Sequence, residues 1–359
     1  MNKEAVRLNL DGVTSVLPYR DYYRGRNGLV AQNLARYLDL PYRDENGVGN
    51  NEYVVLPVAL NKAMANRYGI RGESDFYGGV FEHLNHISKA ILHPCVSMVK
   101  PVFYSDEFAR SVKDLVIPGV TAFSKQDLMD SYAMFRKEYP VIRLKMTTKS
   151  DGHGQYRLSS VSELASILEQ IPEEEVRSDG LVIETNLENK KTVSIGRVVV
   201  GDDKYYFLAR QKNDRAPEDD RDRYMGADVL IVKDETSNLF AADLDVSERK
   251  ALDIGSRFLD CFGYFNPICS RLSFDCLIGN GPTGEDLIGV TDITARLGGT
   301  CPALSLAILE FKKNPGLSLL NAEVNLNYSP GDEKPEERGA MRFIDLPSLR
   351  LTARINNYR

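Results

Sequence analysis

Long apolar runs are missing from this sequence, and their absence excludes a membrane-spanning protein built from helices. No stretch approaches the roughly 18 consecutive apolar residues that a spanning helix needs. The first residues, Met-Asn-Lys-Glu-Ala-Val-Arg, also lack the apolar centre of a secretory signal peptide. We therefore expect a cytoplasmic protein that has no membrane partner.

Closely spaced cysteines are missing as well. The chain has five cysteines, an odd number, and no two of them form a Cys-x-x-Cys pair. Disulfide frameworks and zinc sites use paired or closely spaced cysteines, so we expect reduced thiols, which again suits the cytoplasm. The five are Cys95, Cys261, Cys269, Cys276 and Cys301.

An excess of positive charge is also lacking. The 45 Lys and Arg residues face 51 Asp and Glu residues, which gives a formal net charge of −6 over 359 residues. This balance disfavours broad nucleic-acid binding, although it leaves room for a local basic groove. With 43% hydrophobic and 27% charged residues, the chain has the composition of a folded protein. Its length corresponds to about two domains of roughly 150 residues each.

The short signatures of several enzyme classes are absent. No glycine is followed by Lys-Ser or Lys-Thr, so there is no Walker A motif, and neither Gly-x-Ser-x-Gly nor His-Glu-x-x-His occurs. The run Gly279–Gly284 matches Gly-x-Gly-x-x-Gly. However, it joins two predicted strands and carries Pro282 where a helix would begin, so we interpret it as a hairpin turn. His83 and His86 lack further metal ligands and are interpreted as a surface or packing pair.

Hydrophobic periodicity predicts a mixed α/β chain. Helices are predicted over 28–38, 125–137, 162–170, 247–262 and 302–313. Strands are predicted over 53–58, 141–146, 180–185, 192–200, 204–210, 271–278, 286–294 and 341–345. Ile117-Pro118-Gly119 marks a domain boundary. The acidic, arginine-bearing stretch 213–223 is predicted to be a mobile loop, and 332–338 a solvated linker.

Two features in the middle of the chain suit a nucleotide. Lys145 ends a predicted strand before a loop with Gly152 and Gly154. Such a lysine can neutralise an α- or β-phosphate, and the glycines let backbone N–H groups approach the β- and γ-phosphates. The next buried strand ends at Glu184, three residues before Leu187, and this hinge can offer backbone groups and a carboxylate to adenosine. A solvent-facing lysine and an ordinary strand end are the alternatives.

Two later features suit a metal ion and an anion. Asp275 and Asp292 lie on predicted neighbouring strands, and Mg²⁺ prefers carboxylate oxygens. Asp292, Thr294 and Arg296 alternate, so they share one face of their strand. An acid, a hydroxyl and a guanidinium are costly to bury there without a ligand or partners, and a structural salt-bridge face is the alternative. The turn 298–302 then leads into a helix whose N-terminal N–H groups can bind an anion, unless it is a plain helix start.

Thr300 and Pro302 are the local signals for that helix start. Threonine is a common N-cap, and proline suits the first helical turn. We therefore expect Thr300 to cap the helix that follows it.

In this order, the lysine strand, the glycine loop, the Glu-x-x-Leu hinge and Asp…Asp-x-Thr-x-Arg resemble the ATP-grasp superfamily. The resemblance covers roughly residues 116 to 312, and the run 184–196 is similar to that of biotin carboxylase-like members. Other segments resemble an uncharacterised proteobacterial ATP-grasp-like group. These segments are 69–79, His93-Pro94 and 224–232.

The resemblance implies an α/β (α+β) protein with the ATP-grasp fold. Residues 1–115 would form an N-terminal, pre-ATP-grasp α/β domain. Residues 116–190 would be the subdomain with the glycine-rich loop, and residues 191–330 the subdomain with the metal site. The two subdomains would clamp the nucleotide between them, and residues 331–359 would be a C-terminal tail.

The resemblance also assigns roles to residues. Lys145 and Lys125 would be the two phosphate lysines, Gly152 and Gly154 the phosphate loop, Glu184 the hinge acid and Leu187 the backbone contact to adenine. Asp275, Asp292 and Thr294 would hold Mg²⁺, and Arg296, with Lys145, would act on the reacting phosphoryl group. The family usually has Glu and Asn where this chain has Asp292 and Thr294. Aspartate is shorter and threonine is a poorer metal ligand, which disfavours occupancy by two metal ions.

The implied activity is that of an ATP- and Mg²⁺-dependent ligase. ATP would convert a substrate carboxylate to an acyl phosphate, and an amine, or less readily a thiol, would displace phosphate. A nucleotide-binding protein without turnover and a small-molecule kinase are the alternatives. The expected partners are small carboxylates and amines, with no nucleic acid, and the family implies a homodimer. Since Lys145 is expected at an exposed strand end, Lys145→Ala should reduce nucleotide affinity while the fold survives.

Overall fold

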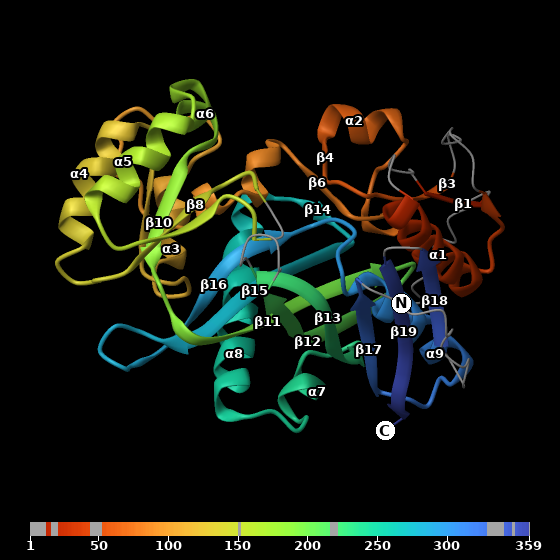
Figure 1. Ribbon diagram of the computed structural model, residues 1–359. Coiled ribbons are helices and arrows are strands. Elements are labelled where there is room, and N and C mark those ends of the chain that lie inside the picture. The colour runs from red at the N-terminus through yellow and green to blue at the C-terminus, as the bar shows by residue number, and fades with distance from the viewer. Residues whose placement is uncertain are drawn as a thin grey trace.

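The computed structural model describes most of the 359-residue chain. The described ranges are 12–15, 21–43, 52–149, 152–215, 222–328, 341–346 and 349–358. Within them the chain forms two short sheets, a small antiparallel sheet and a large antiparallel sheet, with helices packed on their faces (Figure 1). No helix in these ranges is long and apolar enough to cross a membrane.

The N-terminal region builds most of the two short sheets. The first is parallel and has the order β2 (Tyr42–Arg43), β1 (Gly12–Ser15), β3 (Glu52–Val55), β5 (Phe76–Tyr77). The second has the order β14 (Ile268–Cys269), β6 (Gly79–Phe81), β4 (Leu60–Asn61). The helices here are α1 (Asp21–Leu38), α2 (Lys62–Arg67) and α3 (Asp106–Val112), with the short helices η1 (Glu73–Asp75), η2 (Leu84–Ile87) and η3 (Lys89–Ile91).

The small antiparallel sheet carries the predicted lysine strand and hinge strand. Its order is β7 (Gly119–Ala122), β10 (Leu181–Thr185), β8 (Ile142–Met146), β9 (Gln155–Leu158). One face is covered by α4 (Lys125–Phe135), α5 (Val161–Gln170) and α6 (Glu173–Asp179). Leu144 and Ile183 point to these helices and are fully buried with Leu164. The alternate residues of β8 and β10 therefore face the other way, toward the rest of the molecule.

The large sheet has eight strands and holds the predicted carboxylate pair. Its order is β16 (Asp286–Thr294), β15 (Arg271–Asn280), β11 (Glu188–Val200), β12 (Asp203–Arg215), β13 (Asp222–Lys233), β17 (Leu319–Asn327), β19 (Leu349–Tyr358), β18 (Met341–Leu346). Its helices are α7 (Ser237–Phe240), α8 (Val246–Phe262), η4 (Gly263–Phe265) and α9 (Cys301–Lys313).

Alternation along these strands gives the large sheet two buried faces. Ile195, Leu208 and Phe274 belong to the apolar core beneath α8. Phe207 and Ile231 belong to a second core, which also contains buried residues of α9 and α1. Because neighbouring positions of one strand enter different cores, the sheet separates α8 from the α1–α9 pair (Figure 1).

Local chemistry explains where several helices begin. The Ser124 hydroxyl accepts a hydrogen bond from the backbone N–H of Asp127, which caps α4. Asp245 and Glu248 form a reciprocal capping box at the start of α8. Each cap satisfies N–H groups that the first helical turn leaves unpaired. Thr300 does not act in this way: it precedes α9 in helical conformation without a capping bond, so that prediction is wrong.

Most predicted elements occur, but some end in different places. Strands β11 and β12 are longer than predicted, so 213–215 belong to β12, while Asp222 and Arg223 open β13. The predicted mobile loop 213–223 is therefore wrong at both ends, and 216–221 lie outside the described residues, as does the predicted linker 332–338.

Gly279–Gly284 does join two paired strands, which confirms the hairpin. His86 stacks on Phe265 at a ring-centroid distance of 4.2 Å, which confirms its packing role.

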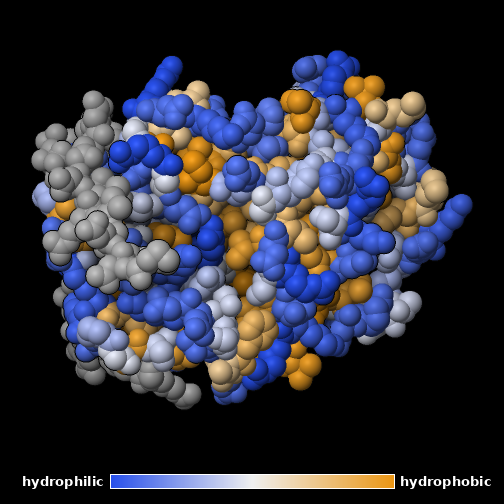
Figure 2. Space-filling view, turned by 180° about the vertical axis from the view of Figure 1, so that it is seen from behind, coloured by the Kyte–Doolittle hydropathy of each residue, from blue (hydrophilic) through white to orange (hydrophobic). Residues whose placement is uncertain are grey.

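The surface is mainly hydrophilic on the face opposite to that of Figure 1. Hydrophobic side chains show there in separate groups between hydrophilic ones (Figure 2). The five cysteines are all free thiols, and Cys269, Cys276 and Cys301 are buried.

Candidate functional site

A cleft lies where the small sheet meets the ends of three strands of the large sheet. Its volume is about 300 Å³, at the lower end of the range for small-molecule sites. Lining residues come from β8, β9, the glycine loop, the hinge and β11–β13. They are Arg143, Gly152, Gln155, Arg157, Asn186, Leu187, Glu188, Lys190, Arg215 and Asp222. The predicted phosphate loop and the predicted hinge thus line one cavity.

The hinge is the two-residue link between β10 and β11, formed by Asn186 and Leu187. The Asn186 side chain accepts a hydrogen bond from Arg143 at 2.8 Å and donates one to Glu188 at 2.9 Å. Glu188 also accepts a hydrogen bond of 3.1 Å from Arg157. Both arginines, which are cross-strand partners on β8 and β9, are therefore tied to residues at the hinge.

Lys145 and Glu184 meet on the inner face of the small sheet. Lys145 is opposite Val182 across the β8–β10 pair, so Glu184 is its diagonal neighbour on the same face. Their side chains form an ion pair, and they are only 4% and 1% exposed. The expectation that Lys145 is an exposed strand-end lysine is wrong, because the N-terminal region covers this face.

His93 is the covering residue. Its Nε2 lies 2.9 Å from Glu184 Oε1, while Lys145 contacts Oε2, so both carboxylate oxygens have partners. Burial alone would raise the pKa of Glu184, but the charge of Lys145 and the hydrogen bond with His93 outweigh it and lower that pKa to about 2. Burial lowers the pKa of Lys145, while Glu184 opposes this change.

The glycine loop follows β8 and returns to β9. Gly152 and Gly154 have φ values of 77° and 64°, a region that favours glycine. The Gly154 carbonyl accepts the N–H of Met146 at 2.8 Å. A Cβ at Gly154 would lie 2.8 Å from the Lys149 side chain and 2.9 Å from that of Met146. The predicted turn is thus present, and Gly154 is required by close approach.

Asp275 and Asp292 face each other directly across β15 and β16. The register shifts beside them, so that Thr291 is an extra residue between the pairs Cys276–Val290 and Asp275–Asp292. Such bulges often re-aim side chains near functional sites. Ser194 donates a hydrogen bond of 2.6 Å to Asp275. The Gln211 side chain in turn donates a hydrogen bond of 2.9 Å to the Ser194 hydroxyl.

The two carboxylates have the chemistry of a divalent-cation site. Burial and the neighbouring charge of Asp292 both raise the pKa of Asp275, since ionising both groups places like charges side by side. No group of three or more His, Cys, Asp or Glu ligands occurs within the described part of the chain. The protein would thus supply two carboxylates, with Thr294 beside them, and phosphate and water would complete the octahedron that Mg²⁺ prefers.

Lys89 connects the carboxylates with the glycine loop. Its Nζ donates a hydrogen bond of 2.9 Å to the carbonyl of Lys149 and lies 3.2 Å from Asp292 Oδ2. The Lys89 side chain is only 6% exposed. Features that are far apart in sequence, namely η3, the glycine loop and β16, therefore converge on one buried ammonium group.

Arg296 and the following turn lie next to Asp292. Asp292, Thr294 and Arg296 are partly exposed while the residues between them are buried, which confirms the predicted alternation. The turn is held by Arg271, which donates a hydrogen bond of 2.6 Å to the Thr294 carbonyl and contacts the Thr300 hydroxyl at 3.5 Å. This buried arginine carried no signal in the sequence pattern.

Lys125 opens α4, at the end of the small sheet from which the glycine loop emerges. Within the described chain no hydrogen bond or ion pair joins its side chain to another residue, so its assignment as the second phosphate lysine stays a prediction.

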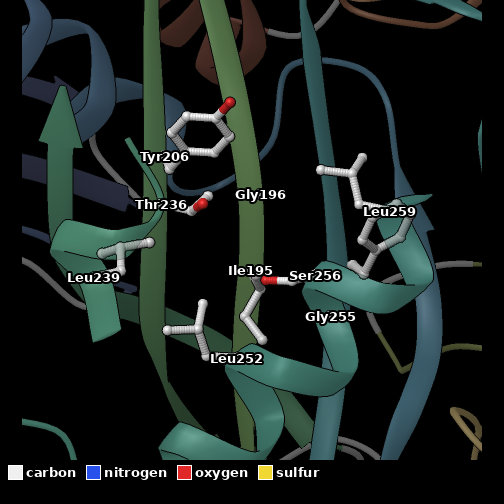
Figure 3. A pocket seen from close by; sticks show the side chains of 10 residues that line it. Ile195, Gly196, Tyr206, Thr236, Leu239, Leu252, Gly255, Ser256 and Leu259 are labelled. Carbon is white, nitrogen blue, oxygen red and sulfur yellow. The ribbon is translucent and has the colours of Figure 1, made fainter. Parts of the chain in front are cut away.

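A second cavity, between α8 and strands β11, β12 and β15, is a packing gap. Its volume is about 10 Å³, around the minimum for one water molecule. Apolar side chains such as Ile195, Leu252 and Leu259 surround it (Figure 3). Its volume leaves no room for a ligand.

Solved structures with this architecture place the chain in a fold class. It is similar to the biotin carboxylase of Campylobacter jejuni, solved as a β,γ-ATP complex, with 10% identity and a TM-score of 0.57 over 97% of this chain and 88% of that one. It is also similar to the biotin carboxylase domain of 2-oxoglutarate carboxylase from Hydrogenobacter thermophilus, solved with MgADP, ADP and bicarbonate. There the identity is 12% and the TM-score 0.55 over 96% and 85% of the chains. The protein has the ATP-grasp fold.

The chain belongs to the family DUF3182, described as a protein of unknown function, whose model matches residues 22–343. None of the curated proteins compared with the chain matches it. At these identities the structural likeness concerns the fold.

Proposed function

We propose that the protein is an ATP- and Mg²⁺-dependent ligase that joins a small carboxylate to an amine. In the first step an oxygen of the substrate carboxylate attacks the γ-phosphorus of ATP, and the bond to the β–γ bridging oxygen breaks to give ADP and an acyl phosphate. In the second step the amine attacks the acyl carbon, releases inorganic phosphate and loses a proton. A thiol nucleophile would follow the same course.

The observation that carries the proposal is the convergence at Lys89. One ammonium group contacts both the glycine loop, through the Lys149 carbonyl, and the carboxylate pair, through Asp292. A loop suited to phosphates and a pair suited to a divalent cation therefore adjoin, beside the hinge cleft. Phosphoryl transfer depends mainly on positioning and charge neutralisation, and this arrangement offers both.

In the proposed reaction each residue acts through charge or position. Lys145 would bind an α- or β-phosphate oxygen, held in place by Glu184. The backbone of Gly152 and Gly154 would cover the β- and γ-phosphates, and the backbone of Leu187 would contact the base. Arg296 would neutralise charge on the transferred phosphoryl group.

Mg²⁺, when held by Asp275 and Asp292 with Thr294 beside them, would supply positive charge to the phosphate oxygens. Closure of the glycine loop would exclude water, which would otherwise hydrolyse the acyl phosphate. Likeness to a biotin carboxylase domain solved with MgADP and bicarbonate supports a nucleotide and a carboxylate-like anion as ligands. The same proposal includes a small amine as the second substrate. It also describes the protein as a cytoplasmic homodimer that belongs to the proteobacterial ATP-grasp-like group.

A second candidate is a nucleotide-binding protein without turnover. The contact of Lys89 with Asp292 favours it, because an ammonium group already provides a cation at one of the two metal-binding carboxylates. Under this reading ATP binds, but substrates do not stimulate release of ADP. A small-molecule kinase would release ADP and a stable phosphorylated product without free phosphate.

Thermal shift with ATP, ADP, GTP and no nucleotide, each with and without Mg²⁺, is the first test. A ligand at 100 times its Kd stabilises the folded state by about 2.7 kcal/mol, which moves the melting midpoint by a few degrees. We expect a Mg²⁺-dependent shift with ATP. Absence of a shift with every nucleotide would overturn all three nucleotide-dependent readings.

Phosphate release in a screen of carboxylate–amine pairs separates turnover from binding. Asp292→Asn should retain part of the ATP-induced shift and lose Mg²⁺-dependent phosphate release. Unchanged release in Asp292→Asn would remove this residue from the mechanism. ATP binding with no release for any pair would favour the second candidate.

A further inference from the structure

Arg143 lies beside the hinge and belongs to none of the nucleotide motifs in the sequence. It is on β8, two residues before Lys145, so the two side chains share the inner face of the small sheet. Arg143 lines the cleft together with Asn186 and Leu187, and its Nη2 donates a hydrogen bond of 2.8 Å to the Asn186 side chain. A base that contacts the backbone of the hinge would therefore meet this guanidinium group.

Glu184, the acid that the sequence resemblance assigns to the hinge, is closed off from the cleft. It is the direct cross-strand partner of Arg143, but its side chain is only 1% exposed, and it is not among the described residues that line the cleft. Its two carboxylate oxygens are paired with Lys145 and His93. On this side of the cleft a base would thus meet the hydrogen-bond donors of Arg143, and not the acceptor oxygens of Glu184.

The guanidinium group of Arg143 has donors to spare. Arginine carries five N–H donors and no acceptor, and within the described ranges the side chain of Arg143 forms one hydrogen bond, to Asn186. Its direct cross-strand neighbour on β9 is Arg157, and like charges opposite each other are destabilising. Acceptor atoms of a ligand would satisfy the spare donors and relieve this repulsion.

The purine bases differ in what they offer to such a group. Guanine presents two acceptors, O6 and N7, along one edge, at the spacing that matches the fork of an arginine. Hypoxanthine, the base of ITP, has the same two acceptors. Adenine presents N7 beside the N6 amino group, which is itself a donor and would face an N–H group of the arginine.

We propose that the cleft takes a 6-oxopurine nucleoside triphosphate, such as GTP or ITP, at least as tightly as ATP, and that Arg143 is the residue that reads the base. Two of its N–H groups would donate to O6 and N7, while its contact with Asn186 holds the guanidinium group at the hinge. The proposal rests on the proposed function, because it keeps the phosphate and metal-ion contacts described there and concerns the base alone.

The first test uses the purified full-length protein without any substitution. Calorimetry with Mg²⁺, in the absence of carboxylate and amine substrates, gives the affinities for ATP, GTP, ITP and 7-deaza-GTP, which has carbon in place of N7. We expect GTP and ITP to bind at least as tightly as ATP, and 7-deaza-GTP to bind about 10-fold less tightly than GTP. Equal affinities for GTP and 7-deaza-GTP, or about 10-fold tighter binding of ATP than of GTP and ITP, would overturn the proposal.

Substitution of Arg143 then separates recognition of the base from support of the hinge. Arg143→Met removes the donors at similar length, and Arg257→Met, at an exposed position on α8, is the matched control. We expect Arg143→Met to lose about 10- to 100-fold in GTP affinity. The loss in ATP affinity should be smaller, since adenine accepts through N7 alone. Arg143→Lys, which keeps the charge without the fork, should recover part of the GTP affinity.

A structural role alone would give a different pattern. If Arg143 only holds Asn186, Arg143→Met weakens the binding of ATP and GTP by the same factor, which overturns the proposal while the proposed function stands. If the wild type binds no nucleotide, both proposals fall. If Arg143→Met does not fold, the comparison of GTP with 7-deaza-GTP decides, because it needs no variant.

Discussion

Glu184 is a buried carboxylate whose two oxygens meet different partners, Lys145 and His93. The three groups form a buried polar network next to the hinge. Removing one member of such a network leaves another member buried and uncompensated, which costs more than the pair itself contributes.

Lys145→Ala should therefore destabilise the fold as well as weaken nucleotide binding. We expect a loss of roughly 3–5 kcal/mol in the free energy of unfolding, because Glu184 would keep its buried charge with only His93 beside it. The double variant Lys145→Met/Glu184→Gln should be closer to the wild type. Urea denaturation of the three proteins tests this, with the exposed Lys250→Ala as a control expected within about 0.5 kcal/mol of the wild type. A single variant as stable as the control would show that the pair is not buried in solution.

Asp275→Asn should stabilise the metal-free protein at neutral pH. Burial and the charge of Asp292 raise the pKa of Asp275 above its ordinary value of 3.8. Its protonated form thus contributes stability that is fully present below pH 3.8 and is lost as the pH rises through the raised pKa. Asparagine keeps an oxygen that can accept the Ser194 hydrogen bond and has no such pH dependence.

Unfolding free energies in EDTA between pH 3 and pH 7 measure this difference. We expect the wild type to lose stability relative to Asp275→Asn as the pH rises. Mg²⁺ at neutral pH should then stabilise the wild type and have little effect on the variant. Parallel pH profiles would show that the two carboxylates do not repel each other.

At the scale of elements, the hinge and the glycine loop connect the small sheet with the large one. The loop closes on itself through Met146 and Gly154, and Lys89 ties it to β16. The strand β8 and the loop could be predicted from alternation and glycine spacing, which are local signals. Their contact with the segment around Lys89 and His93 could not, because nothing local specifies which distant segment covers a sheet face.

Gly154→Ala tests the loop, with Gly284→Ala as a matched control. Both glycines have positive φ, 64° and 87°, so alanine is strained at each, by about 1–2 kcal/mol. A Cβ at Gly154 would approach Lys149 and Met146 within 3 Å, whereas nothing lies within 4 Å of a Cβ at Gly284 in the β15–β16 turn. Both variants should melt earlier, but only Gly154→Ala should lose ATP affinity. Equal ATP affinities would separate the loop from nucleotide binding.

At the scale of the whole molecule, the core on one face of the large sheet brings together helix α1 and the late strand β19. Strand β19 pairs with β17, and its Leu351 and Ala353 are fully buried in the core that also holds Val30 and Leu34 of α1. Within the segment assigned as a C-terminal tail, β19 thus joins this sheet together with β18, where a strand was predicted over 341–345.

Leu351→Ala should destabilise the protein by about 2–5 kcal/mol, as for other fully buried leucines. Its neighbour Thr352 points to the opposite face of β19 and is partly exposed, so Thr352→Ala should cost less than about 1 kcal/mol. Chemical denaturation of both variants compares them. Similar losses in the two would indicate that β19 contributes little to the core.

The sequence by itself determined which residues form helices and strands over most of the chain, and which side chains could perform the chemistry. Alternation, caps and glycine turns are local, so β8, β10, α4, α8 and the β15–β16 pair could be predicted, and with them the location of Asp275 and Asp292 on neighbouring strands. The resemblance carried by these motifs gave the ATP-grasp fold.

Only the tertiary structure decided what surrounds those side chains. It buried Lys145, brought His93 to Glu184 and Lys89 to Asp292, inserted Thr291 as a bulge, and added β19 to the large sheet. Burial, ion pairing and sheet order depend on segments far apart along the chain. Their contacts form because covering an apolar face outweighs the entropy of closing a long loop, and no short window of sequence records that balance.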